Sequence, residues 1–333
     1  MLDPTKFFKR IYAQQTLVAR NAKTNVSPIC YEMDITACPE YDFYKDNEYH
    51  LAIGLNTMYR RKKSSTDMVF YLEDTIKSLV NQIELYYTQN PHDSRKILLF
   101  VQDLSGSLRV PFDNLKVNYS QRVEVILHKS YERFIDPFTD NPNVDYKSKN
   151  NARPSRRARQ QNIDVINLGR TMLSTFNFQH FMFMEDDFEP CNGSFAQIMN
   201  MMNTTIEQDP NYCSISTSYG MNGIILPRMD LDRFLTYVSC HIDAYAIDIL
   251  IRWYFFHDKG LLGANDVPLG FKSCLEEERF SYSSIGVLME HVGSVSTFEE
   301  RSSSSFERLI LKCGDMRRRI DDQVGKLFRI INP

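Results

Sequence analysis

Three consecutive carboxylates follow a strongly apolar stretch in the segment FMEDDFEP, residues 183–190. On one short turn, Glu185, Asp186 and Asp187 repel one another unless a positive charge lies among them. A hard divalent cation, held by these oxygen atoms and by a phosphate group, removes that repulsion. The pattern therefore predicts a metal site that neutralises the charge growing on a leaving diphosphate. A solvated acidic turn is the alternative, and the apolar strand before the acids favours the metal site.

A histidine later in the chain is a second candidate. His291 follows the apolar segment GVLME, and Gly293, two positions further on, allows a tight turn. An imidazole at such a position contacts a metal ion or a phosphate, or it serves as a hydrogen-bonded core residue. The residues alone leave both interpretations open.

Two aspartates lie in the segment HIDAYAIDILIRWYFF, which is predicted to form an apolar helix. When a sugar is transferred to a hydroxyl group with inversion, one carboxylate takes the hydroxyl proton while the oxygen attacks. Asp243 and Asp248 are the candidates for this base, and the apolar neighbours of Asp248 favour a buried acid. The alternative is a helix cap or a partly exposed helix acid.

A basic segment, RPSRRARQQNID (residues 153–164), precedes the acidic turn. It has no interleaved aromatic residues, so it lacks the stacking platform of a single-stranded nucleic-acid site. A solvated loop is the ordinary interpretation, and arginines that approach a diphosphate are the functional one.

A sheet must position these candidates. Apolar runs predict strands and amphipathic spacing predicts helices, and the two alternate along the first half of the chain. Such alternation predicts parallel strands covered by helices, with ligands bound at the carboxyl ends of the strands. Thr57, Asp103 and Glu185–Asp187 are expected at that edge.

Strands are expected at 50–57, 96–103, 123–129, 180–190, 213–220, 222–228 and 282–293, and helices at about 66–87, 156–176, 194–207, 230–237 and 243–257.

The composition fits a globular protein with a sizeable core, because 43% of the 333 residues are hydrophobic and 24% are charged. The formal charge of −3 gives no general attraction to nucleic acid.

We expect an N-terminal arm over 1–48, a catalytic domain over 49–300, and a linker with a C-terminal helical tail over 301–333. The apolar stripe of that tail predicts a docking face, with contact to a membrane surface through Arg317–Arg319 as the alternative.

Seven cysteines are scattered without a CxxC pair, which argues against a closed zinc site. Buried reduced thiols and one or two disulfides in a secretory lumen both remain open.

No apolar stretch reaches the roughly 18 residues that span a membrane. We expect a location in the lumen of the Golgi or the ER if an anchor or a partner supplies targeting, and otherwise a soluble cytoplasmic location.

Four segments together resemble one enzyme family. LAIGLNTMYRRKKS, RQQNIDVINL, FMFMEDDFEP and VLMEHVGSVS are similar, in order and spacing, to segments of the N-acetylglucosaminyltransferase IV family. The related enzymes that add N-acetylgalactosamine to the mannose of GPI anchors share these elements. The resemblance implies an α/β A-type glycosyltransferase fold, with a Rossmann-like mixed sheet flanked by helices. It also implies inverting transfer of N-acetylhexosamine from a UDP-sugar, with Mn²⁺ or Mg²⁺, to a mannose-containing glycan.

The resemblance implies roles for the metal-site candidates. The metal motif of the family corresponds to Glu185, Asp186 and Asp187, with Asp187 as the direct ligand. The histidine of its His-Val-Gly segment corresponds to His291, which is expected to contact the metal or the diphosphate.

The resemblance also indicates where the nucleotide lies. Thr57 and Arg60 match the loop expected near the uridine. Gln161 and Asp164 match the helix that flanks the nucleotide.

Asp248 corresponds best to the catalytic base of the family, with Asp243 as its rival. The proline and the aromatic residue that accompany that base are absent at both positions. No segment of these 333 residues resembles the lectin-like module of the N-glycan branching enzymes. A catalytically silent member of the same fold, which binds a nucleotide-sugar or a glycan and assists a partner, is therefore the alternative function. A nucleotidyl or phosphoryl transfer enzyme fits less well, because no phosphate-cradling glycine loop is present.

Overall fold

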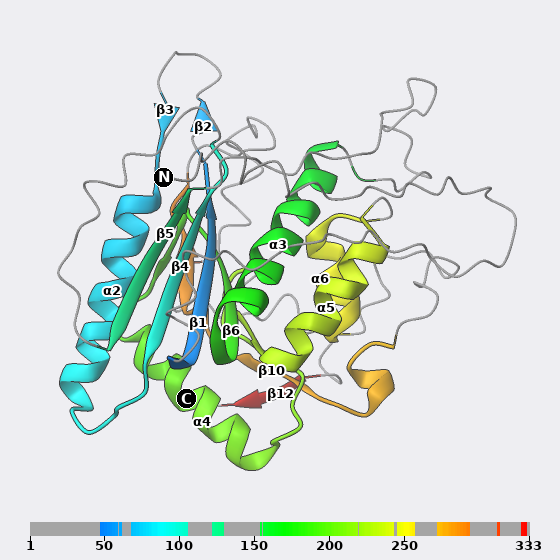
Figure 1. Cartoon of the computed structure of the whole chain (residues 1–333). Coiled ribbons are helices and arrows are strands. Elements are labelled where there is room, and N and C mark those ends of the chain that lie inside the picture. Colours follow the sequence, from blue (N-terminus) through cyan, green and yellow to red (C-terminus); the bar gives the residue numbers. More distant parts are fainter. Residues whose placement is uncertain are drawn as a thin grey trace, which may run out of the picture.

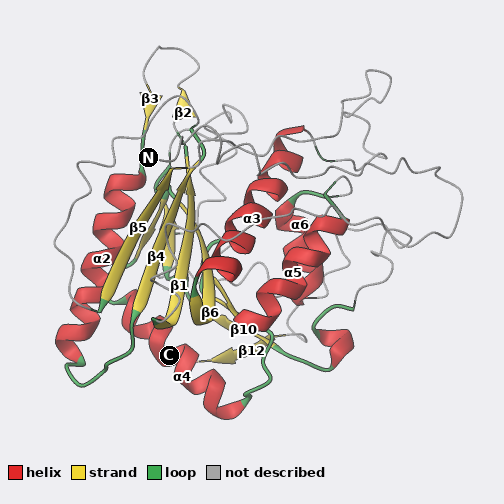
Figure 2. Cartoon of the chain, in the orientation of Figure 1, coloured by secondary structure: helices red, strands yellow, loops and turns green. Residues whose placement is uncertain are grey.

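The computed structural model describes residues 47–58, 60–61, 68–105, 122–129, 154, 156–218, 220–242, 245–256, 272–293, 312–313 and 328–331. Within these residues the chain forms a mixed β-sheet with helices on both of its faces (Figures 1 and 2).

The main sheet, as far as the chain is described, has eight strands in the order β12-β10-β8-β9-β6-β1-β4-β5. Neighbouring strands are parallel except at β9, which runs antiparallel to both β6 and β8. The strands are β1 (Glu48–Thr57), β4 (Ile97–Asp103), β5 (Val123–Lys129), β6 (Asn177–Glu185), β8 (Ser214–Ser216), β9 (Ile224–Pro227), β10 (Ser281–Ser284) and β12 (Phe328–Ile331).

Two small antiparallel ribbons lie outside the main sheet. One pairs β2 (Arg60–Arg61) with β3 (Met68–Val69). The other, the β7–β11 ribbon, pairs β7 (Phe188–Pro190) with β11 (Met289–His291). The second ribbon joins the segment after the acidic turn to the segment that contains the candidate histidine.

Helices cover both faces of the sheet. Helix α2 (Leu72–Gln89) and helix α4 (Ser194–Gln208) share one hydrophobic core with the sheet. The helices α3 (Arg156–Thr175), α5 (Arg228–Cys240) and α6 (Ile247–Phe256) share the other. A short 3₁₀ helix, η5, spans Leu275–Glu277. Figure 1 shows α2 and α3 on opposite sides of the strands.

The apolar runs of the sequence explain this three-layer arrangement. In β1, Leu51, Ile53 and Leu55 belong to the core beneath α2 and α4, whereas Ala52 belongs to the core beneath α3 and α5. Successive side chains of a strand point to opposite faces, so a strand covered on both sides must be apolar throughout. All seven residues of β4 are buried, as this predicts.

The predicted α/β class is confirmed, because the chain has a Rossmann-like mixed sheet flanked by helices. The assignment to the A-type glycosyltransferase fold stays a prediction. Several element boundaries were wrong. The strand expected over 180–190 is divided by the turn at Asp186–Asp187 into β6 and β7. Helix α2 begins at Leu72 rather than near residue 66, because Met68–Val69 pairs with β2. The strand predicted over 282–293 is two strands, because the chain turns after β10, where the Ser284 hydroxyl donates to the carbonyl of Gly286 at 2.6 Å.

The predicted helical tail is also corrected where the structure describes it. Residues Phe328–Ile331 form β12, which pairs in parallel with β10 in the main sheet. An open strand edge offers unpaired backbone groups, and the β-branched residues of this segment suit that position. Residues 312–313 of the predicted tail are not helical, and residues 301–311, 314–327 and 332–333, including Arg317–Arg319, lie outside the described residues, as do residues 1–46 of the predicted arm. No helix within the described ranges is long and apolar enough to cross a membrane.

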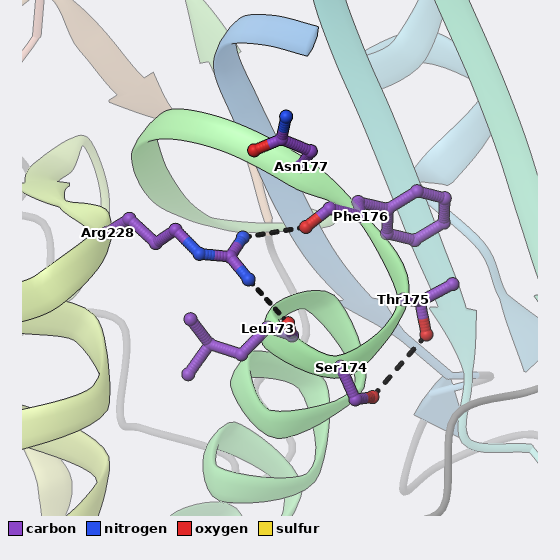
Figure 3. A pocket seen from close by; sticks show the side chains of 6 residues that line it. All are labelled: Leu173, Ser174, Thr175, Phe176, Asn177 and Arg228. Carbon is purple, nitrogen blue, oxygen red and sulfur yellow. Dashed lines mark hydrogen bonds between the residues drawn. The ribbon is translucent and has the colours of Figure 1, made fainter. Parts of the chain in front are cut away.

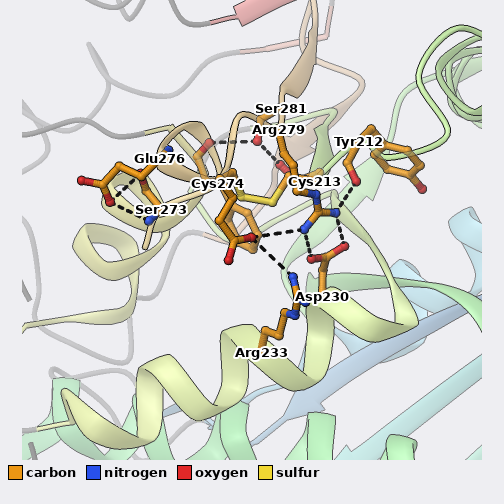
Figure 4. Close-up of a disulfide and its surroundings, with 12 residues drawn as sticks. Tyr212, Cys213, Asp230, Arg233, Ser273, Cys274, Glu276, Arg279 and Ser281 are labelled. Atoms are coloured by element: carbon orange, nitrogen blue, oxygen red, sulfur yellow. Dashed lines mark hydrogen bonds and ion pairs between the residues drawn. A yellow bond between two sulfur atoms is a disulfide. The ribbon is translucent and has the colours of Figure 1, made fainter. Parts of the chain in front are cut away.

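The described cysteines form disulfides. Cys191 is bonded to Cys313 and Cys213 to Cys274, with Cα–Cα distances of 5.6 and 6.0 Å. Figure 4 shows the second disulfide beside a buried ion pair, in which Arg279 donates to both carboxylate oxygens of Asp230 at 2.5 and 2.7 Å. A bidentate pair of this kind orients both partners firmly. Because these four cysteines are bonded in pairs, the structure favours disulfides over reduced thiols.

A polar network lies at the amino ends of β1 and β6. The ring of His50 contacts that of His180 at 5.1 Å between centroids, and the Tyr212 hydroxyl lies 2.8 Å from His180 Nδ1. Arg95 approaches His50 Nε2 at 3.2 Å and forms an ion pair with Asp93 at 2.6 Å. Burial, together with the nearby charges of His50 and Arg95, lowers the pKa of His180 to about 4. The folded state therefore resists protonation of His180.

We predict that this histidine makes the fold sensitive to acid. In the unfolded chain His180 binds a proton near pH 6.5, well above its pKa in the folded state. The contribution of neutral His180 to the free energy of unfolding is therefore fully present above pH 6.5 and is lost as the pH falls toward 4. From the two pKa values, the free energy of unfolding should be about 2 kcal/mol lower at pH 5 than at pH 7.5. Urea denaturation of His180→Gln should show most of this difference removed. The exposed His92 provides the control, and an equal effect of His92→Gln would contradict the prediction.

Candidate active site

The acidic turn lies at the carboxyl edge of the parallel strands, as the sequence predicted. In the register of the sheet, Asn56 pairs with Glu185 and Thr57 pairs with Asp103. The ends of β1, β4 and β6 therefore meet at one edge. Asp186 and Asp187 follow directly after β6 and turn the chain into β7.

Asp187 and His291 face each other across the turn. His291 Nε2 lies 3.0 Å from Asp187 Oδ2, and the backbone N–H of Val292 donates to the Asp187 carbonyl at 2.9 Å. The β7–β11 ribbon places His291 opposite Phe188, whose ring packs edge-on against the imidazole with centroids 5.0 Å apart. The fold therefore brings together two residues that are 104 positions apart in the sequence.

Gly293 lets the backbone approach Asp187 closely. A Cβ atom at this position would lie 2.4 Å from Asp187 Oδ2 and 2.9 Å from its Cβ. No real side chain tolerates these distances, so the glycine is required by the position of the Asp187 carboxylate. The tight turn predicted after His291 thus has a specific use.

The Asp187–His291 pair fits a divalent cation. Adjacent ligands in an octahedral shell of radius about 2.1 Å are about 3 Å apart, which is the separation of these two donor atoms. Within the described residues, no group of three or more His, Cys, Asp or Glu side chains could hold a metal ion. Two protein ligands leave most of such a shell to phosphate oxygens and water, which is the usual situation for Mg²⁺-like ions that bind with a phosphorylated substrate.

Asp186 is buried and braces the site. Its Oδ2 atom accepts hydrogen bonds from the Thr57 hydroxyl at 2.7 Å and from the Met58 N–H at 3.3 Å. Its carbonyl accepts a bond from the Thr75 hydroxyl at 2.7 Å. These contacts tie the acidic turn to the end of β1 and to α2. The structure therefore places Thr57 against Asp186, and the predicted contact of Thr57 with uridine stays a prediction.

Glu185 is held by two elements. Gln161 of α3 donates to its Oε1 atom at 3.3 Å, and Asn222 donates to its Oε2 atom at 2.7 Å. The Glu185 N–H donates in turn to Asn222 Oδ1 at 2.6 Å. Sequence reasoning missed Asn222, because the dipeptide Asn222–Gly223 indicates only a turn. Gly223 has a φ of +68°, which lets the turn point Asn222 at Glu185.

Helix α3 flanks the same edge of the sheet. The carbonyl of Asp164 accepts a hydrogen bond from Asn56 Nδ2 at 3.2 Å, and its carboxylate accepts one from Gln160 at 3.0 Å. The structure therefore places both Gln161 and Asp164 beside the carboxyl edge. Their contact with a nucleotide stays a prediction.

Of the two candidate general bases, the structure describes only Asp248. Asp248 lies in the first turn of α6 and is exposed, so the expectation of a buried acid was wrong. It lies near the turn that contains Asn222, since a Cβ atom on Gly220 would be 3.2 Å from Asp248 Oδ1. Asp243 lies outside the described residues. Arg60 lies in β2, and its side chain is outside the described part of the chain.

A hollow of the surface lies at the opposite end of β6 from the acidic turn (Figure 3). Arg228 lines it and donates to the carbonyl groups of Leu173 and Phe176, both at 2.6 Å. These bonds satisfy carbonyl groups at the carboxyl end of α3. The hollow is therefore a structural feature of the helix end, and it has no part in the candidate site.

Comparisons with known proteins give little further information. No family model matches the chain, and no curated protein matches it. Among solved structures, the chain is similar to mouse xyloside xylosyltransferase 1 in its apo form. The identity is 9%, the TM-score is 0.34, and the match covers 81% of this chain and 96% of the other. A superposition this loose does not establish a shared function.

We predict that Gly293→Ala displaces the Asp187 carboxylate, because the added Cβ atom overlaps Oδ2. Affinity for Mn²⁺ in the presence of UDP should fall about tenfold or more, as for other changes that misplace a metal ligand. Isothermal titration calorimetry measures this affinity. Gly193→Ala controls for backbone strain alone: its φ of +71° makes alanine unfavourable, but a Cβ there meets nothing within 4 Å, so it should lower stability and leave the Mn²⁺ affinity unchanged. Unchanged affinity in Gly293→Ala would show that the close approach is not needed.

Proposed function

We propose that the chain is an inverting, metal-dependent glycosyltransferase. It transfers N-acetylhexosamine, GlcNAc or GalNAc, from a UDP-sugar to a hydroxyl group of a mannose-containing glycan. The observation that carries the proposal is the Asp187–His291 pair, with donor atoms 3.0 Å apart at the carboxyl edge of the sheet. Ligands of open α/β sheets bind at this edge.

Asp187 and His291 would hold Mn²⁺ or Mg²⁺ in this reaction. When bound, the cation neutralises the charge that grows on the departing diphosphate. The ribbon of β7 and β11 fixes both side chains before substrate arrives, so little reorganisation is needed when that charge develops. Asp186 contributes by bracing the turn from below.

Further polar groups at the same edge support binding of a nucleotide. Asn56 and Gln102 are neighbours in the register of β1 and β4. Within the described structure, the buried atoms Asn56 Oδ1 and Gln102 Oε1 accept no hydrogen bond. Such buried acceptors are costly unless a ligand supplies N–H or O–H donors. A nucleoside offers both kinds of donor.

Asp248 is our candidate for the general base. The acceptor oxygen attacks the anomeric carbon, the bond from that carbon to the phosphate oxygen breaks, and UDP leaves with the electron pair. The attack comes from the face opposite the diphosphate, so the configuration inverts, and Asp248 takes the hydroxyl proton, so the charges balance. Its exposed position suits access by a large glycan.

We also propose a compartment. Structural disulfides persist in oxidising compartments and are rare in the cytosol. The disulfides Cys191–Cys313 and Cys213–Cys274 therefore support the lumen of the secretory pathway over the cytoplasm.

The proposed reaction predicts release of UDP from UDP-GlcNAc or UDP-GalNAc when Mn²⁺ and a mannose-bearing acceptor are present. A coupled assay measures UDP. Asp187→Ala should abolish release, because one of the two protein ligands is lost, while Asp232→Ala, which changes an acid on α5, should keep it. Release that is indifferent to Asp187→Ala or to a chelator would contradict the metal mechanism. Binding of UDP-sugar without any turnover would favour the catalytically silent alternative.

A second prediction separates the base from the donor site. Asp248→Asn should bind UDP-sugar and Mn²⁺ as the unaltered protein does, because the residue lies on α6 and outside the metal pair. Its kcat should fall by about 10² or more, the usual effect of losing a general base. Stopped-flow or steady-state kinetics measure the loss. Unchanged turnover in Asp248→Asn, with loss in Asp243→Asn, would assign the role to Asp243.

A further inference from the structure

The β7–β11 ribbon that holds the Asp187–His291 pair is short for an independent structure. Each strand has three residues. A two-stranded ribbon of this length is marginal in water by itself. External contacts must therefore keep it in place.

A like-charge pair weakens the ribbon further. Glu189 and Glu290 are directly opposite each other in its register, and like charges at such positions destabilise a strand pair. The ribbon thus carries an unfavourable interaction at its centre, next to His291.

Cys313 is fastened to this ribbon at two points. Cys191, which follows β7 directly, forms the disulfide to Cys313, and the Cys191 N–H donates to the Leu288 carbonyl at 2.9 Å. The N–H of Cys313 donates to Glu290 Oε2 at 3.1 Å, which places a partial positive charge beside the repelling carboxylates. Only three residues separate Cys191 from Asp187, and Glu290 adjoins His291.

We propose that the Cys191–Cys313 disulfide is a positioning element of the metal site. It fastens Cys313 to the β7–β11 ribbon and so keeps Asp187 and His291 at ligand spacing. The metal part of this inference rests on the proposed function. The positioning part concerns only the order of the ribbon.

The chain provides a matched control in its second disulfide. Cys213 and Cys274 are buried at 1% and 2% exposure. Their bond lies beside the Asp230–Arg279 ion pair (Figure 4). Cys213 directly precedes β8, which runs in the same direction as β6, so it lies at the edge of the sheet opposite the acidic turn. Removal of either disulfide should lower stability. Of the two, only removal of Cys191–Cys313 should disturb the ribbon.

The test compares Cys313→Ala with the double variant Cys213→Ala/Cys274→Ala. Cys313 is exposed, so its replacement leaves no buried cavity. In metal-free protein, hydrogen–deuterium exchange over residues 288–293 should accelerate in Cys313→Ala and not in the control. With UDP present, the affinity for Mn²⁺ should fall roughly tenfold in Cys313→Ala and stay unchanged in the control.

Exchange and Mn²⁺ affinity that are unchanged in Cys313→Ala, or changed equally in both variants, would overturn the proposal. If exchange accelerates but the unaltered protein binds no Mn²⁺, the proposed function fails and the positioning role stands. If Cys313→Ala does not fold, mild dithiothreitol treatment of the unaltered protein replaces it. Mass spectrometry then confirms that Cys191 and Cys313 are alkylated while the buried disulfide is intact, and the same two measurements decide.

Discussion

The contact between Asp187 and His291 is the interaction on which the rest of the site depends. Neither residue is held by its own local segment alone. The acidic turn is braced by Thr57 and Thr75 through Asp186. The histidine is held by its strand pairing with Phe188. The sheet, helix α2 and the β7–β11 ribbon therefore all converge on one carboxylate–imidazole pair.

This convergence divides the three acids of the turn into separate roles. Asp187 contacts His291, whereas the Asp186 carboxylate accepts a hydrogen bond from Thr57 within the fold. Glu185 is shared between α3 and the turn that contains Asn222. The repulsion expected among three adjacent carboxylates is thus relieved largely by neutral donors. In the proposed reaction, a cation would be needed only beside Asp187, where the diphosphate would lie.

The sequence predicted the sheet well, because apolar runs such as those of β1 and β4 must be buried on both faces. It also predicted that the acids and Thr57 share one edge, which follows from parallel strands. It failed where tertiary contacts override local pattern. Phe328–Ile331 joins a sheet edge instead of a helix, and no local signal indicates that Asn222 binds Glu185. The pairing of β7 with β11 depends on segments about 100 residues apart, which periodicity cannot reveal.

The central claim is that Asp187 and His291 together bind one divalent cation. Crystals grown with Mn²⁺ and UDP, measured at the manganese absorption edge, test this claim most directly. The account predicts a single anomalous peak at about 2.2 Å from both Asp187 Oδ2 and His291 Nε2. A peak located elsewhere, or none while the two side chains keep their direct hydrogen bond, would contradict it.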